Sequence, residues 1–133
     1  MRITIKFVVV LVLSALNFAY ASNSSLIRDN TLSEYNKYDV YKIINDDKQV
    51  GYAIQDLESS EWYAISLKGG KRNFRIVCEN PRFSHALRWE RSFTISHGSL
   101  KKRNDGTLDA SGVKRIDTGD EMCAKGGFQF FIE

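Results

Sequence analysis

From about Tyr35 to the C-terminus, short runs rich in β-branched and aromatic residues alternate with clusters of turn-forming residues. No window of this stretch keeps the 3.6-residue apolar spacing of an amphipathic helix. The clearest period is a two-residue alternation over residues 87–96, where apolar side chains two positions apart share one face of a strand. Arg91 interrupts that apolar row, so we expect it to lie near a sheet end, to reach solvent or to pair with an acid. The chain is therefore expected to form almost no helix.

The turn residues between these runs favour antiparallel neighbours. Asn45 to Lys48 predict a hairpin between strands at 38–44 and 50–54, because Asn and Asp side chains hydrogen-bond their own backbone. Asn104-Asp105-Gly106 predicts another tight turn, and residues 128–132 predict the last strand. Parallel strands would need crossovers of about a dozen residues or more, which this spacing does not provide. We therefore predict an all-β fold, an antiparallel β-sandwich or small barrel of about eight strands with little helix.

Residues 1–21 have the layout of a secretory signal peptide. Basic Arg2 and Lys6 precede an apolar run at residues 7–16, and Ala19-Tyr20-Ala21 is an exit of small residues. The apolar run is about half of the roughly 20 residues that span a bilayer, and polar residues follow it. We therefore expect cleavage after Ala21 and a secreted protein.

Cleavage there leaves 112 of the 133 residues, which is the size of one domain. Residues 22–34 are mostly polar with isolated aliphatic side chains, and we interpret them as a flexible lead-in or one short helical turn. Residues 35–133 are interpreted as a single β domain. Asn23-Ser24-Ser25 is an N-glycosylation acceptor pattern, which makes Asn23 a candidate glycan site.

The charge of the secreted form is close to balanced. Loss of Arg2 and Lys6 reduces the 19 basic residues to 17, against 16 acidic residues. Proteins that require nucleic acid carry a clustered excess of Lys and Arg, so we expect no nucleic-acid partner. After the leader no apolar run exceeds a few residues, so we expect no membrane partner and a soluble monomer.

Cys78 and Cys123 are the only cysteines. An even number of cysteines in a secreted chain favours a disulfide between them, whereas two separate buried thiols are the alternative. The cysteines and the two histidines, His85 and His97, lack the paired spacing of metal ligands, so we expect no metal and no cofactor.

The strongest hint of catalysis is the order His85, Glu90, Arg91 and His97, which matches the residue types of small secreted β-type ribonucleases. If residues 87–97 form one strand, Glu90 faces away from Arg91 and His97. Acid and base groups must converge within about 3 Å of one reacting atom, so we predict that the protein is not an enzyme. A small secreted ribonuclease is kept as an alternative.

Adjacent aromatic residues raise a question of which face they occupy. Trp62 and Tyr63 cannot share one face of a strand, and Tyr38 and Tyr41 have the same parity conflict. At least one of each pair is therefore expected to be exposed or covered by another layer. An exposed Trp62 or Tyr63 could stack on a sugar, which makes a carbohydrate-binding module an alternative, while core packing between two sheets accounts for the same residues.

Lys101-Lys102-Arg103 is the one basic run of the expected domain. Charge on an edge strand also protects against edge-to-edge pairing, so the run has a purely structural interpretation as well. Loops over a rigid sandwich commonly carry recognition. On that basis the candidate partner surface comprises Lys101, Lys102, Arg103, Asp105, Asp120 and Glu121.

The layout of a short leader at residues 1–21, one β domain at 35–133, two cysteines and no active-site motif resembles the small secreted effectors of plant-pathogenic fungi. Among these, the chain is similar to avirulence effectors of the cereal rust type, whose β-sandwich resembles cupins or carbohydrate-binding modules. The resemblance implies a virulence role, translocation into the host cell cytoplasm, binding of a host protein, and detection by an intracellular plant immune receptor. It implies no catalytic residue. It also implies a reducing compartment, in which the Cys78–Cys123 bond would be at risk.

Overall fold

The computed structural model describes residues 23–34, 37–79, 88–119, 123 and 127–133. Its strands are β1 (Ser24–Arg28), β2 (Tyr38–Asn45), β3 (Lys48–Asp56), β4 (Trp62–Ser66), β5 (Arg72–Cys78), β6 (Trp89–Ile95), β7 (Ser99–Lys102), β8 (Leu108–Ser111), β9 (Lys114–Ile116) and β10 (Phe128–Ile132). All pairings between these strands are antiparallel, and no residue in the described ranges is helical. The predicted all-β antiparallel fold is confirmed, with ten strands among the residues that the structure describes, where about eight were expected.

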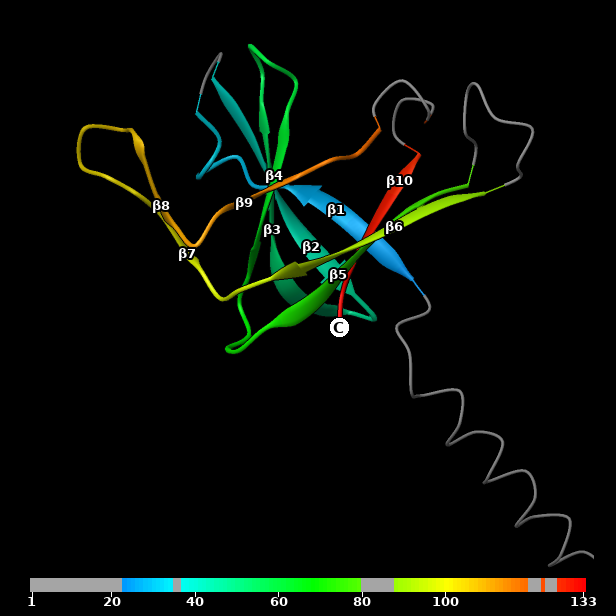
Figure 1. Ribbon diagram of the computed structural model, residues 1–133. Coiled ribbons are helices and arrows are strands. Elements are labelled where there is room, and N and C mark those ends of the chain that lie inside the picture. Colours follow the sequence, from blue (N-terminus) through cyan, green and yellow to red (C-terminus); the bar gives the residue numbers. More distant parts are fainter. Residues whose placement is uncertain (1–22, 35–36, 80–87, 120–122, 124–126) are drawn as a thin grey trace, which may run out of the picture.

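The strands form two sheets and a separate hairpin (Figure 1). The large sheet has the order β1-β2-β3-β4-β9, and the small sheet has the order β10-β5-β6. Strands β7 and β8 form a two-stranded hairpin that extends away from the crossing point of the sheets. In the part of the chain that the structure describes, neither sheet closes on itself, so the architecture is sandwich-like and not a closed barrel.

The core between the two sheets, called the inner core below, consists of the inward side chains of both layers. The small sheet supplies Phe74, Ile76 and Phe130, whose side chains are fully buried. The large sheet supplies Ile43 and Ala53 among others. A second cluster, the outer core, lies on the opposite face of the large sheet and consists of Val40, Ile54 and Ile65. The large sheet is thus apolar on both faces, so its outer face needs a cover.

The parity conflict of the aromatic residues is resolved by these two cores. The Trp62 ring packs in the inner core, 5.5 Å from the Phe130 ring and 5.6 Å from the Tyr41 ring. Tyr63 and Tyr38 pack against the outer core instead. Both aromatic pairs are therefore split between the two faces, and all four side chains are half-buried.

Asn45 connects the two sheets where β2 passes β10. Its Nδ2 donates to the Phe130 carbonyl at 2.9 Å, and its Oδ1 accepts from the Ile132 amide at 2.9 Å. The Ser24 hydroxyl of β1 donates to the same Phe130 carbonyl at 2.6 Å. The Asn45 amide therefore takes the place of a peptide group from a neighbouring strand and satisfies the free edge of β10.

Side chains also connect the sheets at the other edge, between β6 and β9. Arg91 on β6 pairs with Asp117 just after β9, and the Lys114 Nζ donates to the Thr94 carbonyl at 2.7 Å. Of the three alternatives predicted for Arg91, pairing with an acid is therefore the one that the structure shows. The Asp117 carboxyl accepts from the Gly119 amide and lies beside Arg91, and both interactions hold its pKa below the usual value.

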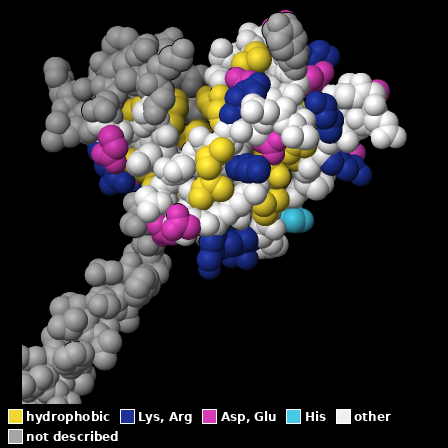
Figure 2. All heavy atoms as spheres, turned by 180° about the vertical axis from the view of Figure 1, so that it is seen from behind, with side chains coloured by type: hydrophobic (Ala, Val, Ile, Leu, Met, Phe, Trp, Pro, Cys, Tyr) yellow, Lys and Arg dark blue, Asp and Glu magenta, His cyan; other side chains and the backbone are white. Residues whose placement is uncertain are grey.

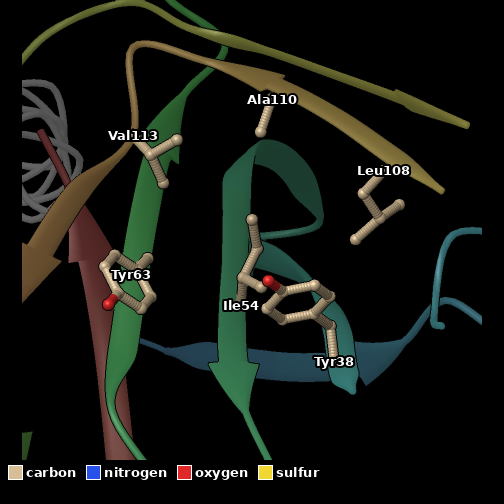
Figure 3. Close-up of a pocket in the computed structure, with 6 residues that line it drawn as sticks. All are labelled: Tyr38, Ile54, Tyr63, Leu108, Ala110 and Val113. Atoms are coloured by element: carbon tan, nitrogen blue, oxygen red, sulfur yellow. The ribbon is translucent and has the colours of Figure 1, made fainter. Parts of the chain in front are cut away.

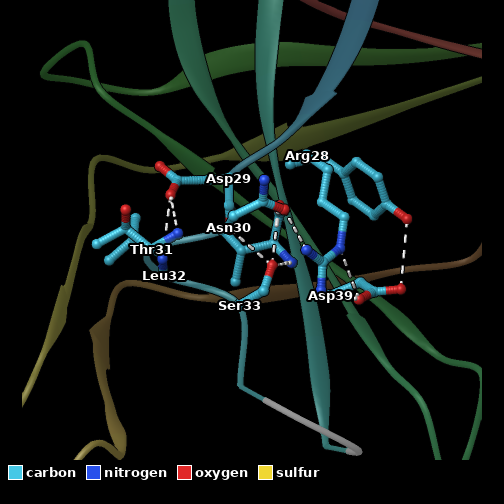
Figure 4. A network of polar contacts seen from close by, with 9 residues as sticks. Arg28, Asp29, Asn30, Thr31, Leu32, Ser33 and Asp39 are labelled. Carbon is cyan, nitrogen blue, oxygen red and sulfur yellow. Dashed lines mark hydrogen bonds and ion pairs between the residues drawn. The ribbon is translucent and has the colours of Figure 1, made fainter.

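The segment interpreted as a flexible lead-in is different in the structure. Residues 24–28 form β1, which pairs with β2 from Ser24 opposite Asn45 to Arg28 opposite Tyr41. The following turn is ordered by Asp29, whose Oδ1 accepts from the amides of Thr31 and Leu32 at 3.0 Å each (Figure 4). The interpretation was wrong here because the strand depends on pairing with a distant segment and not on its own apolar pattern.

Two predicted features of the β domain are present in the structure. Asp46 and Asp47 form the turn between β2 and β3 with left-handed φ angles of 46° and 68°, as the turn prediction requires. Cys78 and Cys123 are joined in a disulfide with a Cα–Cα distance of 5.8 Å.

Candidate functional site

Hairpin β7–β8 covers part of the outer core. Leu100 and Leu108 are on the same face of the hairpin and pack against Val40, Ile54 and Ile65 of the large sheet. Lys102 shares this inward side, and its Nζ donates to the Thr31 carbonyl at 3.0 Å, across 71 positions of sequence. These contacts fix the hairpin over the sheet as a second, partial layer.

The base of the hairpin is held by two glycines in close approach. A Cβ on Gly98 would lie 2.3 Å from the Ser111 carbonyl oxygen and 2.7 Å from the Ile65 Cγ2. A Cβ on Gly112 would lie 2.4 Å from the His97 carbonyl oxygen, and Gly112 also has a left-handed φ of 71°. A side chain at either position would collide with backbone atoms, so only glycine allows the two ends of the hairpin to lie this close together.

Between the hairpin and the large sheet lies a hollow of about 210 Å³, which we call the tyrosine hollow (Figure 3). Its floor comes from three neighbouring strands of the sheet, and its cover comes from β8 and the residue before β9. The residues that line it are Tyr38, Ile54, Tyr63, Leu108, Ala110 and Val113. Ala110 and Val113 are exposed, so the hollow opens to solvent beside them.

The Tyr63 wall of the hollow is held by a chain of polar contacts. The Tyr63 hydroxyl donates to the Glu61 Oε2 at 3.0 Å, and the Arg115 Nε lies 3.2 Å from the Glu61 Oε1. The hydrogen bond to Glu61 raises the pKa of Tyr63 above its usual value of 10.0. The ring is therefore neutral at ordinary pH, and its hydroxyl already has a partner.

The residues predicted as a partner surface do not form one group. Lys101 and Arg103 are on the outward face of the hairpin and both approach Asp109, at 3.9 Å and 3.6 Å. Lys102 is turned inward to Thr31, which gives it a structural role instead of a place on the outward face. Asp105 caps its own turn by accepting from the amide and the hydroxyl of Thr107, which lowers the pKa of its carboxyl. Asp120 and Glu121 lie outside the described residues.

The aromatic residues predicted for sugar stacking are separated by the sheet. Trp62 lies in the inner core against Phe130, so its ring face is used for packing. Tyr63 lies on the outer face and lines the tyrosine hollow. A flat stacking platform made of both residues is therefore excluded by their opposite orientation.

The residues of the ribonuclease alternative also have separate environments. Glu90 pairs with Arg75 at 3.3 Å and with Arg88 at 3.6 Å, while Arg91 pairs with Asp117. His97 is exposed beyond the end of β6, and its backbone forms an isolated parallel β-bridge with Ser66. His85 lies outside the described residues. The opposite faces of Glu90 and Arg91 follow from the strand parity that the sequence predicted.

The remaining surface features are the candidate glycan site, the distribution of charged side chains and the groups that could bind a metal or a membrane. Asn23 is exposed immediately before β1, and its role as a glycan site stays a prediction. Basic, acidic and hydrophobic side chains are interspersed on the face shown in Figure 2. Within the described ranges, no three His, Cys, Asp or Glu side chains are grouped as metal ligands. Across the same ranges, no helix has the length and hydropathy needed to cross a membrane.

Sequence reasoning missed the tyrosine hollow. The strand alternation indicated that Tyr38 and Tyr41 lie on opposite faces of the sheet, as do Trp62 and Tyr63, and the structure confirms both separations. It did not reveal that a distant hairpin would cover Tyr38 and Tyr63 incompletely.

Comparisons with protein-family models, with curated proteins and with solved structures found no match. The resemblance to fungal effectors therefore stays a prediction from the layout of the chain.

Proposed function

We propose that the protein is a secreted, non-enzymatic interaction protein that binds a host protein through the outward face of hairpin β7–β8. The observation that carries the proposal is a charged face on a rigid support. The side chains of Lys101, Arg103 and Asp109 are 76%, 57% and 40% exposed, although the hairpin itself is fixed to the sheet from its other face.

These charges contribute little to the fold. Exposed ion pairs typically stabilise a protein by about 0 to 1 kcal/mol, so Lys101, Arg103 and Asp109 can exchange their mutual contacts for contacts with a partner. Charge complementarity at such a surface mainly sets partner choice and association rate. The outward charges of the hairpin therefore suit a recognition role, whereas its inward side chains cover the outer core.

The biological setting of the proposal comes from the leader and from the resemblance of the layout to fungal effectors. In that setting the secreted form enters plant cells, binds a host component and is detected by an intracellular immune receptor. The disulfide between Cys78 and Cys123 forms during secretion, and the fold must then persist where thiols are reduced.

Charge reversal tests the proposal without disturbing the core. Tagged leaderless protein is expressed in plant cells, and co-purifying host proteins are quantified together with immune cell death. Lys101→Glu and Arg103→Glu should each lose the same host protein while the melting temperature changes by no more than a few degrees. Lys71→Glu, a reversal of an exposed lysine on the link between β4 and β5, is the matched control and should retain it.

The proposal is wrong if the two hairpin variants and Asp109→Lys retain every host protein that the unchanged chain captures. A host protein lost equally from the hairpin variants and from Lys71→Glu would show a nonspecific charge effect and would also contradict it.

A further inference from the structure

We infer that the tyrosine hollow is a binding site for a small, neutral ring compound that carries one N–H or O–H group. This inference goes beyond the proposed protein partner and does not rest on it, since the hollow lies beneath strand β8 and the charged surface lies on the other face of the hairpin.

The size of the hollow sets the size of the ligand. Its volume of about 210 Å³ exceeds the roughly 150 Å³ of an engineered apolar cavity that stays dry and binds benzene. One or two fused rings therefore fit, whereas an oligosaccharide or a longer acyl chain would not be enclosed.

The lining of the hollow sets the charge of the ligand. All six lining residues are aliphatic or aromatic. The two carboxylates that act on Tyr63 already have partners: Glu61 is paired with Arg115 and with the Tyr63 hydroxyl, and Asp56 accepts from two backbone amides of its own turn. Moving an ion from water into such surroundings is strongly unfavourable, whereas moving a neutral ring is favourable. The site therefore discriminates against carboxylate and ammonium ligands.

The layered construction favours a flat ligand. The floor side chains Tyr38, Ile54 and Tyr63 come from adjacent strands, and Leu108 and Ala110 face them from β8 (Figure 3). Two facing β layers lie about 10 Å apart, which leaves space for one layer of atoms where a cover residue is small. Ala110 is that small residue, and the hairpin cannot sink to close the space because Leu108, Lys102 and Gly98 fix its height.

A single hydroxyl supplies the polar contact. The Tyr38 hydroxyl points toward the middle of the six lining residues, whereas the Tyr63 hydroxyl points away from Leu108 (Figure 3). Within the described ranges no residue hydrogen-bonds the Tyr38 hydroxyl, and that of Tyr63 is bonded to Glu61. A ligand N–H or O–H can therefore donate to the Tyr38 oxygen, which selects a ring with one donor over a plain hydrocarbon.

The test is a titration of the full chain, labelled with ¹³C at the methyl groups of Ile, Leu and Val, followed by NMR. Indole, toluene and benzoate are the probes. Indole should shift the methyl signals of Ile54, Leu108 and Val113 in a saturable way, with a Kd between about 0.05 and 5 mM, a range typical of ligands of this size. Toluene should bind more weakly at the same methyl groups, and benzoate should not saturate them.

Variants separate the hollow from the rest of the surface. Ala110→Leu places a large side chain under the hairpin and should weaken indole binding at least tenfold. Ser111→Leu adds the same side chain to the outward face of the same strand and should leave the Kd within about twofold. Tyr38→Phe should raise the Kd of indole about three- to tenfold, as expected for one neutral hydrogen bond, and leave that of toluene unchanged. If Ala110→Leu does not fold, Val113→Phe narrows the opening and takes its place.

The inference is overturned if the methyl shifts do not saturate below about 20 mM indole, because enclosed ligands of this size bind more tightly than that. It is equally overturned if neither Ala110→Leu nor Val113→Phe weakens indole binding, or if benzoate binds as tightly as indole. Loss of host-protein capture in the hairpin variants, with indole binding retained, would show that the two surfaces act separately.

Discussion

Replacement of Asn45 by Ala is the sharpest test of how the two sheets are held together. Asn45 is 5% exposed, and its side-chain amide bonds the Phe130 carbonyl and the Ile132 amide, both on the free edge of β10. The Asn45→Ala substitution would keep the backbone pairing of β2, since Ala has the same peptide group, and would remove the two hydrogen bonds from the Asn45 side chain to β10.

The magnitude follows from what each backbone group loses. The Phe130 carbonyl keeps the hydrogen bond from the Ser24 hydroxyl at 2.6 Å, so its loss is that of one net hydrogen bond, about 0.5 to 1.5 kcal/mol. The Ile132 amide belongs to a residue that is 3% exposed, and among the described residues only Asn45 is seen to accept from it, so leaving it unpaired costs about 1 to 3 kcal/mol. The free energy of unfolding should therefore fall by about 1.5 to 4.5 kcal/mol, which corresponds to roughly 6 to 20 °C in melting temperature for a domain of about 110 residues.

Urea denaturation followed by tryptophan fluorescence measures this change, because Trp62 packs 5.5 Å from the Phe130 ring and reports the same region. Asn73→Ala is the matched control. Asn73 is exposed, and its Nδ2 donates to the Glu133 Oε2 at 3.3 Å, so its removal should change the stability by less than about 0.5 kcal/mol.

Equal losses in the Asn45 and Asn73 variants would refute the reasoning. They would mean that water or a shift of β10 replaces the two contacts of Asn45, so that its side chain is not acting as a peptide group between the sheets.

Three further predictions concern other parts of the fold. Reduction of the Cys78–Cys123 bond should lower the free energy of unfolding by about 4 kcal/mol, because a loop of 45 residues gains freedom in the unfolded chain; equal urea midpoints with and without dithiothreitol would contradict this. Gly98→Ala should destabilise by about 1 to 3 kcal/mol in thermal melts, whereas Gly69→Ala, with nothing within 4 Å, should be near neutral. Asp117→Asn should lower the free energy of unfolding at pH 7. The loss should disappear at pH values well below the usual Asp pKa of about 3.9, because a carboxyl whose pKa is lowered in the folded state stabilises the fold only while it is ionised. A loss of stability that is the same at all pH values would disprove this prediction.

Local chemistry was sufficient for several elements. The strand at 128–132 was predicted with the bounds that β10 has, because its aromatic and β-branched run follows a pair of glycines. The turn at Asp46 and Asp47 was also predictable, since these residues tolerate left-handed φ angles. In both cases the residues that carry the prediction lie in the segment or beside it, although β10 itself pairs with the distant strand β5.

Strand β1 was not predictable in this way. Its residues Ser24–Arg28 carry only two aliphatic side chains, Leu26 and Ile27, and the strand forms by pairing with β2 and by the contact of Ser24 with β10. Hydrogen bonds between distant backbones carry no signature in the sequence of either segment. Lys102 illustrates the same limit, because it belongs to a charged run that looks uniform until the structure turns it toward Thr31.

The amino-acid sequence by itself determined the strand character, the antiparallel pairing and the split of Trp62 from Tyr63, because side chains alternate between the faces of any strand. Only the tertiary structure decided what covers each face. Hairpin β7–β8, positioned by Gly98 and the Lys102 contact, covers Val40 and Ile65 but leaves the hollow beside Tyr38 and Tyr63. The physical reason is that the depth of a cover depends on packing between segments that are far apart in the chain, and no local pattern encodes that distance.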